Sequence, residues 1–260
     1  MAKPTLSDFI SQHPYCCFCG GEKVTESRDE VPPRTLFFER QWPEGYRFPS
    51  CNECNQSSRL VDQALGLIGR LSYADAYSDV ENITPHISGV ANNSPTLLPI
   101  TPKSSIEAKK ILRDLGMEKP AGMFAVDVPI ALVSKETMDA LNPFFSKLFC
   151  ALYYKHVGKI LPNASKIAIV KTTNQILDQE NPFGWQVIPG QTFRPQIQRA
   201  GKSLHEQFDY NWMYNSEEEL FGFNFQIRFS LFGIMFGPVS DELVAELPEG
   251  MLLTTGVVGP

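Results

Sequence analysis

Four cysteines in two Cys-x-x-Cys pairs are the residues of this chain best suited to chemistry. Cys16 and Cys19 form the first pair, and Cys51 and Cys54 form the second. Four thiolates at this spacing can converge tetrahedrally on one Zn²⁺ ion, at about 2.3 Å each. Four sulfur ligands close the coordination sphere and leave no position for a reacting water, so the pattern predicts a structural zinc site.

The other two cysteines are expected to pack rather than to bind metal. Cys17 adjoins Cys16, but only Cys16 keeps the two-residue spacer to Cys19. Cys150 lies in an apolar segment, where a free thiol behaves as a small hydrophobic group. The 31 residues between Cys19 and Cys51 exceed the insert of a simple zinc ribbon and leave room for a β-hairpin.

A short acidic motif lies between the two cysteine pairs. Asp29 and Glu30 begin the stretch Asp-Glu-Val-Pro-Pro, and Asn55 follows directly after Cys54. Taken without further context, Asp29 and Glu30 are expected to be a solvated acidic pair at the end of a strand.

The cysteine pairs, the Asp-Glu-Val-Pro-Pro motif and the Cys-Asn-Glu-Cys-Asn stretch at positions 51–55 resemble the zinc-stabilised HNH endonucleases of bacteria and phages. The resemblance covers about residues 14–65, a quarter of the chain. It implies a treble-clef, ββα-metal module in which Asp29 binds a catalytic Mg²⁺ or Mn²⁺ ion. It also implies that Asn55 contributes from the start of the following helix, and that Glu30 occupies the position of the general base.

Glu30 stands where the resemblance calls for histidine. A neutral imidazole, with a pKa near about 6.5, carries no charge that would repel a phosphate. A carboxylate, with a pKa near about 4.3, is a weaker base at neutral pH and is anionic beside an anionic substrate. Glu30 could instead be an additional oxygen ligand beside Asp29, because Mg²⁺ favours oxygen.

Three functions therefore remain open. The first is an HNH-type endonuclease that hydrolyses phosphodiester bonds of nucleic acid with Asp29, Glu30 and Asn55. The second is a catalytically inactive HNH-like zinc protein that acts as a binding or regulatory factor in phage–host conflict. The third is a plain zinc-ribbon interaction protein.

The charge of the chain argues against a broad contact surface for nucleic acid. The formal net charge is −6, whereas proteins that bind duplex DNA through many phosphates are usually basic. A nucleic acid, DNA rather than RNA, or a protein partner is expected to contact a local surface. The span 134–171 is the most basic part and includes six lysines, although a lysine-rich solvent face of a helix is the alternative. The candidate phosphate contacts are Arg28, Arg34, Arg59, Lys155 and Lys159.

Composition predicts three segments and an α+β fold. Residues 1–75 carry the zinc-bound module, and residues 76–103, rich in Asn, Ser, Thr and Pro, are typical of a linker. Residues 104–260 are expected to form a larger α+β domain with a mostly antiparallel sheet. The chain has no run of 18 apolar residues and its start lacks a signal peptide, so we expect a cytoplasmic protein with no membrane partner.

Within the last segment, helix signals precede strand signals. Ser104 and Glu107 form a capping box for a helix that ends at Gly116. Ser134 caps a long helix that ends near Gly158 and is kinked or broken at a proline, position 143, and we expect this helix to cover the sheet. Strands are predicted at 126–133, 167–171, 185–188, 208–213, 221–229 and 252–258.

Overall fold

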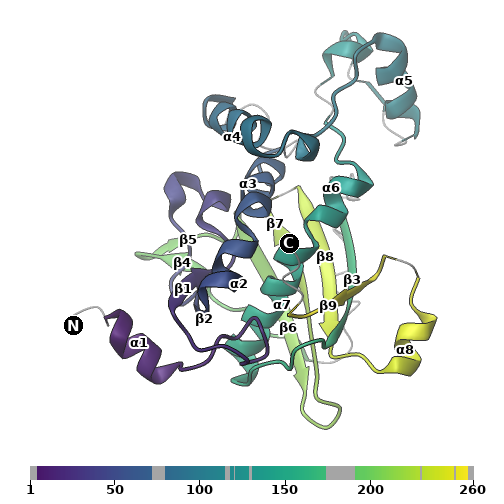
Figure 1. Ribbon diagram of the computed structural model, residues 1–260. Coiled ribbons are helices and arrows are strands. Elements are labelled where there is room, and N and C mark those ends of the chain that lie inside the picture. Colours follow the sequence, from purple (N-terminus) through teal and green to yellow (C-terminus); the bar gives the residue numbers. More distant parts are fainter. Residues whose placement is uncertain are drawn as a thin grey trace.

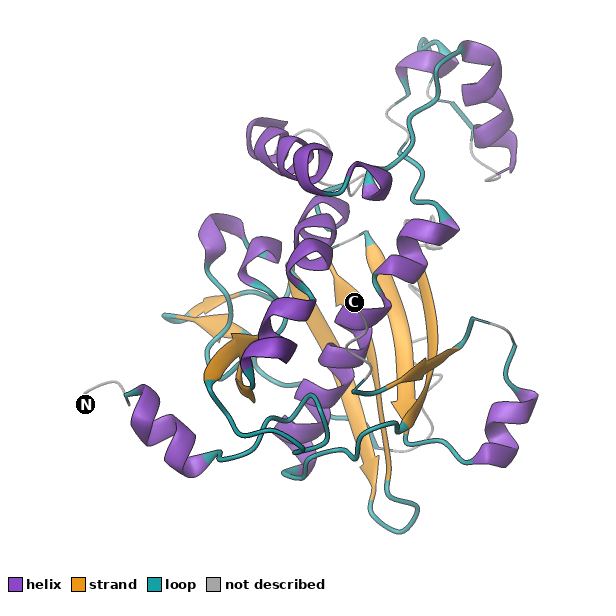
Figure 2. Ribbon diagram, viewed as in Figure 1, coloured by secondary structure: helices purple, strands orange, loops and turns teal. Residues whose placement is uncertain are grey.

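An antiparallel sheet with one long helix across its face forms the centre of the molecule (Figures 1 and 2). The computed structural model describes residues 5–71, 80–114, 118–119, 121–128, 131–173, 191–228, 230–248 and 250–256. The cysteine-bearing N-terminal segment lies beside the long helix, on the same side of the sheet (Figure 1). The mixture of helices and antiparallel strands confirms the predicted α+β class.

The five strands of the main sheet follow the order β6-β7-β8-β3-β9, and every neighbouring pair is antiparallel. Alternate residues of β7 place Phe221, Phe223 and Phe225 in the core, as the alternation in the sequence predicts. The strands of this sheet are β3 (Lys166–Thr173), β6 (Phe208–Asn215), β7 (Leu220–Ile227), β8 (Leu231–Gly237) and β9 (Leu252–Thr254).

The long helical segment is broken into α6 (Lys135–Ala140) and α7 (Asn142–Val157). Ser134 caps the first helix, with its Oγ accepting a hydrogen bond from the Thr137 N–H at 3.1 Å. The proline at position 143 lies in the first turn of α7, where its missing N–H costs no helical hydrogen bond. Gly158 ends α7 with a φ of 76°, a left-handed conformation that glycine adopts without a steric penalty.

Aromatic rings join α7 to the sheet. The ring of Phe149 lies 5.6 Å from that of Phe221 and 5.8 Å from that of Phe223, and Phe145 lies 5.7 Å from Phe225. Burial of each such side chain stabilises the fold by about 1.5–3 kcal/mol. The helix therefore has a fixed position on the sheet, and any side chain it directs toward the N-terminal segment is fixed with it.

The N-terminal segment contains a two-stranded antiparallel sheet between the cysteine pairs. Strand β1 (Ser27–Glu30) pairs with β2 (Arg47–Ser50), so that Asp29 lies opposite Phe48. This pair of strands agrees with the expected hairpin. The helices of this segment are α1 (Leu6–Gln12), α2 (Asn52–Ser57) and α3 (Arg59–Ile68), with short 3₁₀ turns at η1 (Arg34–Leu36) and η2 (Phe38–Arg40).

The segment 76–103, predicted to be a linker, contains α4 (Val80–Asn93) and a 3₁₀ turn, η3 (Pro95–Leu97), among its described residues. Helix α4 packs against α3. Beyond it, α5 (Ser105–Asp114) and η4 (Ala125–Asp127) form a small separate cluster that projects from the main body (Figure 1). The remaining elements are β4 (Gln198–Arg199), β5 (Lys202–Ser203) and α8 (Asp241–Glu246).

One predicted strand is wrong, and another lies outside the described residues. Within 126–133, the structure has η4 and a single bridge from Leu132 to Ile100 instead of a strand in the residues it describes. A proline at position 129 removes one donor from any ladder that this segment could form. The strand predicted at 185–188 and the helix end predicted at Gly116 fall outside the described residues.

One buried cluster spans the N-terminal segment, α7 and the main sheet, from Cys16 and Tyr46 to Phe145 and Phe221. A chain of hydrogen bonds crosses it. The Tyr210 hydroxyl lies 2.8 Å from the Tyr46 hydroxyl and 2.8 Å from His156 Nε2. Tyr46 directly precedes β2, Tyr210 lies on β6 and His156 lies on α7. The hydrogen bonds among these three side chains therefore help to fix the position of the N-terminal segment.

The titration of His156 gives a testable pH dependence. Burial, assisted by the charge of Lys155, lowers the pKa of His156 from 6.5 to about 4. Between pH 6.5 and pH 4 the unfolded chain therefore binds a proton at His156 that the folded chain does not bind. The free energy of unfolding should fall as the pH drops through this window. We expect a loss of about 2 kcal/mol after allowing for partial exposure.

Urea unfolding at a series of pH values checks this expectation. The variant His156→Gln keeps a hydrogen-bonding side chain but does not titrate, so its stability should depend less on pH across this window. If the free energy of unfolding depended on pH in the same way for the native chain and the variant, His156 would not have a lowered pKa in the folded state.

Candidate metal centre and the buried polar cluster beside it

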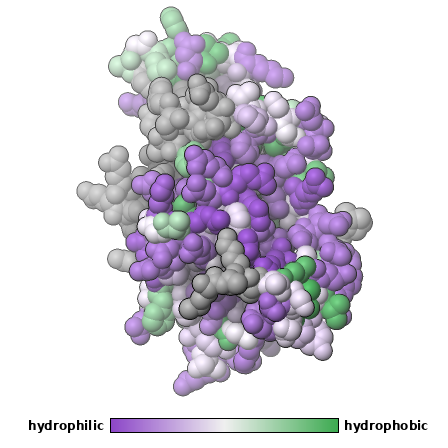
Figure 3. Space-filling view, turned by 90° about the vertical axis from the view of Figure 1, so that its left-hand side faces the viewer, coloured by the Kyte–Doolittle hydropathy of each residue, from purple (hydrophilic) through white to green (hydrophobic). Residues whose placement is uncertain are grey.

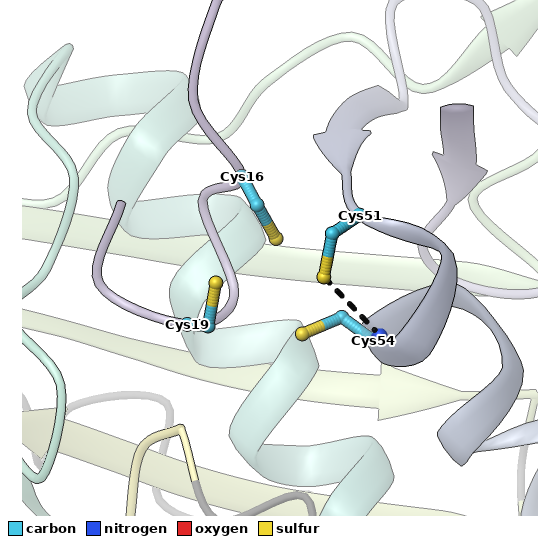
Figure 4. A group of neighbouring side chains, drawn as sticks. All are labelled: Cys16, Cys19, Cys51 and Cys54. Carbon is cyan, nitrogen blue, oxygen red and sulfur yellow. Dashed lines mark hydrogen bonds between the residues drawn. The ribbon is translucent and has the colours of Figure 1, made fainter. Parts of the chain in front are cut away.

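The four predicted cysteines converge on one point. The sulfur atoms of Cys16, Cys19, Cys51 and Cys54 all lie within 4.8 Å of one another, and all four residues are buried. Figure 4 shows the first two on a loop and the other two at the start of α2, with the sulfur atoms directed toward one another. This arrangement confirms that the cysteine pairs form a single candidate metal site.

Local structure explains this convergence. The first pair lies on a turn in which Gly20 and Gly21 have φ values of 66° and 80°. A side chain at Gly20 would place its Cβ 2.3 Å from the backbone nitrogen of Asn163, so only glycine fits there. In the second pair, Cys51 is the N-cap of α2 and its Sγ accepts the N–H of Cys54 at 3.5 Å.

A metal ion such as Zn²⁺ fits this donor set. A tetrahedral site with zinc–sulfur bonds of about 2.3 Å has sulfur–sulfur distances of roughly 3.8 Å. The four sulfur atoms, which lie within 4.8 Å of one another, therefore need to move only slightly closer together. Cys17 and Cys150 are buried outside the group. Burial raises the pKa of the Cys17 thiol well above its ordinary value and that of Cys150 to about 12, which leaves both as packing residues.

A lysine from α7 reaches into the module beside the metal site. Lys147 Nζ lies 2.5 Å from Asp29 Oδ2, and both residues are 8% exposed. The same ammonium group donates to the Cys54 carbonyl oxygen at 2.9 Å and to Ser58 Oγ at 2.9 Å. Burial raises the pKa of Asp29, and the Lys147 charge acts against that effect.

A second carboxyl group, that of the half-buried Asp62, borders this polar cluster. Ser58 Oγ lies 3.3 Å from Asp62 Oδ2 on α3. Burial raises the pKa of Asp62 to about 7, with Lys147 acting to lower it and Asp29 acting to raise it. The Lys147 ammonium group thus contacts the Asp29 carboxylate directly and reaches Asp62 only through Ser58.

Glu30 belongs to a different environment from Asp29. Successive residues of a strand direct their side chains to opposite faces. Glu30 forms an ion pair with Arg34, and its Oε1 lies 3.6 Å from Arg47 Nε. Asn55 lies on the Asp29 side of β1, where its Nδ2 donates to Ser27 Oγ at 2.9 Å. The three residues predicted to be catalytic thus engage three different partners: Asp29 contacts Lys147, Glu30 contacts Arg34 and Asn55 contacts Ser27.

The five candidate phosphate contacts are distributed over several parts of the surface. Arg28 bonds the Thr5 carbonyl oxygen near α1, and Lys159 Nζ lies 3.0 Å from Glu219. Arg59 is exposed at the start of α3. Arg34 and Lys155 both approach the 42–46 segment: Arg34 stacks on Trp42, and Lys155 donates to the Gly45 carbonyl oxygen at 3.0 Å.

Sequence reasoning missed Lys147 and Asp62 as members of the site. A signal for Lys147 exists, because a lysine in the strongly apolar stretch 144–152 is rarely buried unless it is paired. No comparable signal identifies Asp62, or pairs Lys147 with Asp29, which lies 118 positions earlier in the chain.

Comparisons with protein-family models, with curated proteins and with solved structures give no match to this chain. Among the described residues, no helix is both long and apolar enough to cross a membrane.

The metal assignment predicts about one equivalent of zinc per chain in protein purified without chelators. The substitution Cys51→Ser removes one of four ligands, so we expect loss of the metal and a large fall in the melting temperature. Cys150→Ala is the matched control, because it removes a buried thiol outside the group and should leave the zinc content unchanged. Metal analysis that finds no zinc in the native chain would contradict the assignment.

The raised pKa of Asp62 predicts a second effect of pH. Its carboxyl group ionises near pH 3.8 in the unfolded chain but near 7 in the folded one, so the folded state loses stability as the pH rises through this window. Asp62→Asn cannot ionise, and we expect it to gain about 2 kcal/mol relative to the native chain between pH 5 and pH 8. Chemical unfolding of both proteins at pH 5 and pH 8 measures this gain. If the difference in the free energy of unfolding between the two proteins were the same at both pH values, Asp62 would ionise normally.

Proposed function

We propose that this chain is a catalytically inactive, HNH-like zinc protein that acts by binding. The observation that carries the proposal is the Lys147 ammonium group, 2.5 Å from the Asp29 carboxylate. In the HNH-like interpretation, Asp29 is the residue that would hold the catalytic metal ion. A protein cation already neutralises it.

The order of elements supports the HNH-like interpretation. Strands β1 and β2 precede α2, and the cysteine pairs lie on either side of the strands. Asp29 lies on β1, and Asn55 lies in the helix that starts at the second pair. This is the strand–strand–helix order that the resemblance implies.

A catalytic Mg²⁺ or Mn²⁺ ion does not fit beside Asp29 in this arrangement. Two unit positive charges 4 Å apart repel by about 4 kcal/mol at an effective dielectric constant of 20, and a divalent ion doubles that figure. Withdrawal of Lys147 would leave the Cys54 carbonyl oxygen and Ser58 Oγ without the donor that now serves them. The buried lysine therefore opposes the metal both by its charge and by its hydrogen bonds.

The environment of Glu30 also argues against hydrolysis. A general base must be free to accept a proton from water within hydrogen-bonding distance. The Glu30 carboxylate is paired with Arg34 and lies near Arg47, and only 19% of its side chain is exposed. Its Oε1 accepts a hydrogen bond from Arg34 and faces Arg47, which agrees with a structural role.

A cleavage assay tests the proposal. The native chain, Asp29→Ala and Glu30→His are incubated with supercoiled plasmid, single-stranded DNA and RNA, each with Mg²⁺ or Mn²⁺. We expect the native chain to cleave no faster than Asp29→Ala, because no metal ion is held at Asp29. Metal-dependent cleavage by the native chain that Asp29→Ala abolishes would establish the endonuclease instead.

A double-mutant cycle tests the buried ion pair independently of cleavage. Lys147→Met leaves an unpaired buried carboxylate, and we expect a loss of about 3–5 kcal/mol in the free energy of unfolding. Asp29→Asn combined with Lys147→Met removes both charges and should recover part of this loss. Additive effects of the two substitutions would show that the groups do not interact.

A further inference from the structure

Three guanidinium groups surround the indole ring of Trp42. The Cζ atoms of Arg34, Arg199 and Arg47 lie 3.7, 4.1 and 5.1 Å from the ring centroid. They come from distant parts of the chain: η1, β4 and β2, respectively. The fold therefore assembles a local arginine cluster (Arg34, Arg47 and Arg199) in a chain whose overall charge is negative.

The arginine cluster is held in place by contacts of its own. Arg199 Nη1 donates to the Trp42 carbonyl oxygen at 3.0 Å. Beside it, the Glu44 N–H donates to the Gln198 carbonyl oxygen at 3.0 Å, and Glu44 Oε1 accepts the Ala200 N–H at 3.1 Å. These bonds fix the β4–β5 hairpin against the segment that carries Trp42, so the guanidinium groups are ordered before any ligand arrives.

The outward side of the cluster is cationic. The side chains of Arg34 and Arg47 are 36% and 41% exposed, whereas that of Glu30, which pairs with them, is 19% exposed. The carboxylate thus lies beneath the guanidinium groups. Lys155, which donates to the Gly45 carbonyl oxygen, adds a fourth positive charge to those of the three arginines. Glu44, which accepts the Ala200 N–H, adds a second carboxylate to that of Glu30.

The face of the molecule that includes β1, β2, β4 and β5 is mainly hydrophilic, with only scattered hydrophobic residues (Figure 3). A partner that required a large apolar contact would find little surface for it on this face. A charged ligand suits it better.

We propose that the arginine cluster binds the phosphate groups of a nucleic-acid strand. Guanidinium groups present planar, forked donors that match phosphate oxygens, and stacking on an aromatic ring holds them in position. Three ordered guanidinium groups exceed the need of a single phosphate, whereas a nucleic-acid strand supplies one negative charge per nucleotide. This inference rests on the binding function proposed above and names its ligand.

The same geometry predicts weak sequence preference. The guanidinium groups already occupy the surroundings of the Trp42 ring, so this ring supports the arginines rather than stacking on a base. Contacts to phosphate alone give affinity and strong salt dependence but read no sequence.

Fluorescence anisotropy with a labelled single-stranded oligo(dT) of about 20 nucleotides tests the proposal, with salt varied from about 50 to 200 mM. We expect Arg34→Gln, Arg47→Gln and Arg199→Gln each to weaken binding by about three- to tenfold at the lower salt concentration. Each loss should also reduce the slope of log K against log salt by about 0.7. Arg113→Gln is the matched control, because this arginine lies on α5, in the small cluster that projects from the main body, and the variant should bind like the native chain.

Two further comparisons identify the ligand. Arg199→Lys keeps the positive charge but loses the paired N–H donors of the guanidinium group. We expect its affinity to lie between those of the native chain and Arg199→Gln. Inorganic phosphate and a phosphoserine peptide serve as competitors, and both should compete much more weakly than unlabelled oligonucleotide.

Several results would overturn the inference: no binding of oligonucleotide by the native chain, equal binding by the three arginine variants, or tighter binding of the phosphopeptide. None of these would alter the outcome of the cleavage assay, so failure of the phosphate site and failure of the proposed function are distinguishable. Melting temperatures of the variants show whether each one is folded.

Discussion

The ammonium group of Lys147 holds together the part of the molecule that carries the candidate site. It lies on α7, yet it contacts the Asp29 carboxylate on β1, the carbonyl oxygen of Cys54 and the hydroxyl of Ser58. An unpaired charge at this depth would be strongly destabilising, so each of these partners is needed. The ion pair fixes how the cysteine-bearing segment sits on α7.

The metal site and the ion pair are coupled through the backbone. Cys54 offers its sulfur to the metal site and its carbonyl oxygen to Lys147. Loss of the metal would therefore disturb the acceptor of the buried lysine, and loss of the lysine would disturb the turn that presents the thiolate. The aromatic packing of α7 on β7 extends this dependence to the main sheet, because Phe145 and Phe149 flank Lys147 on the same helix.

Sequence patterns predicted the features that depend on local chemistry. The spacing of the cysteines predicted one four-sulfur site, Ser134 and Gly158 predicted the ends of the α6–α7 segment, and strict alternation predicted β7. The failures involve contacts between distant residues. Lys147 was one of six lysines in a segment expected to present either a nucleic-acid face or a solvent face. Nothing in spacing or composition identifies a buried partner more than 100 positions away. The Trp42 cluster was missed for the same reason, since Arg199 reaches it from β4.

The proposed loss of hydrolysis and the proposed phosphate site are consistent with one another. The two acidic residues at the end of β1 are neutralised by protein cations, Asp29 by Lys147 and Glu30 by Arg34 and Arg47. On the inner side the Lys147 charge opposes the binding of a divalent ion at Asp29. On the outer side the three guanidinium groups of the arginine cluster outnumber the Glu30 carboxylate. The cluster therefore keeps positive charge that an anionic ligand can neutralise.

A crystal structure of the zinc-loaded protein soaked in MnCl₂ tests the central claim most directly. Anomalous scattering locates both metals independently of any assay. We predict zinc among the four cysteine sulfurs and no manganese peak at Asp29, with Lys147 Nζ in contact with its carboxylate. A manganese ion bonded to an Asp29 oxygen, with Lys147 displaced, would contradict the account.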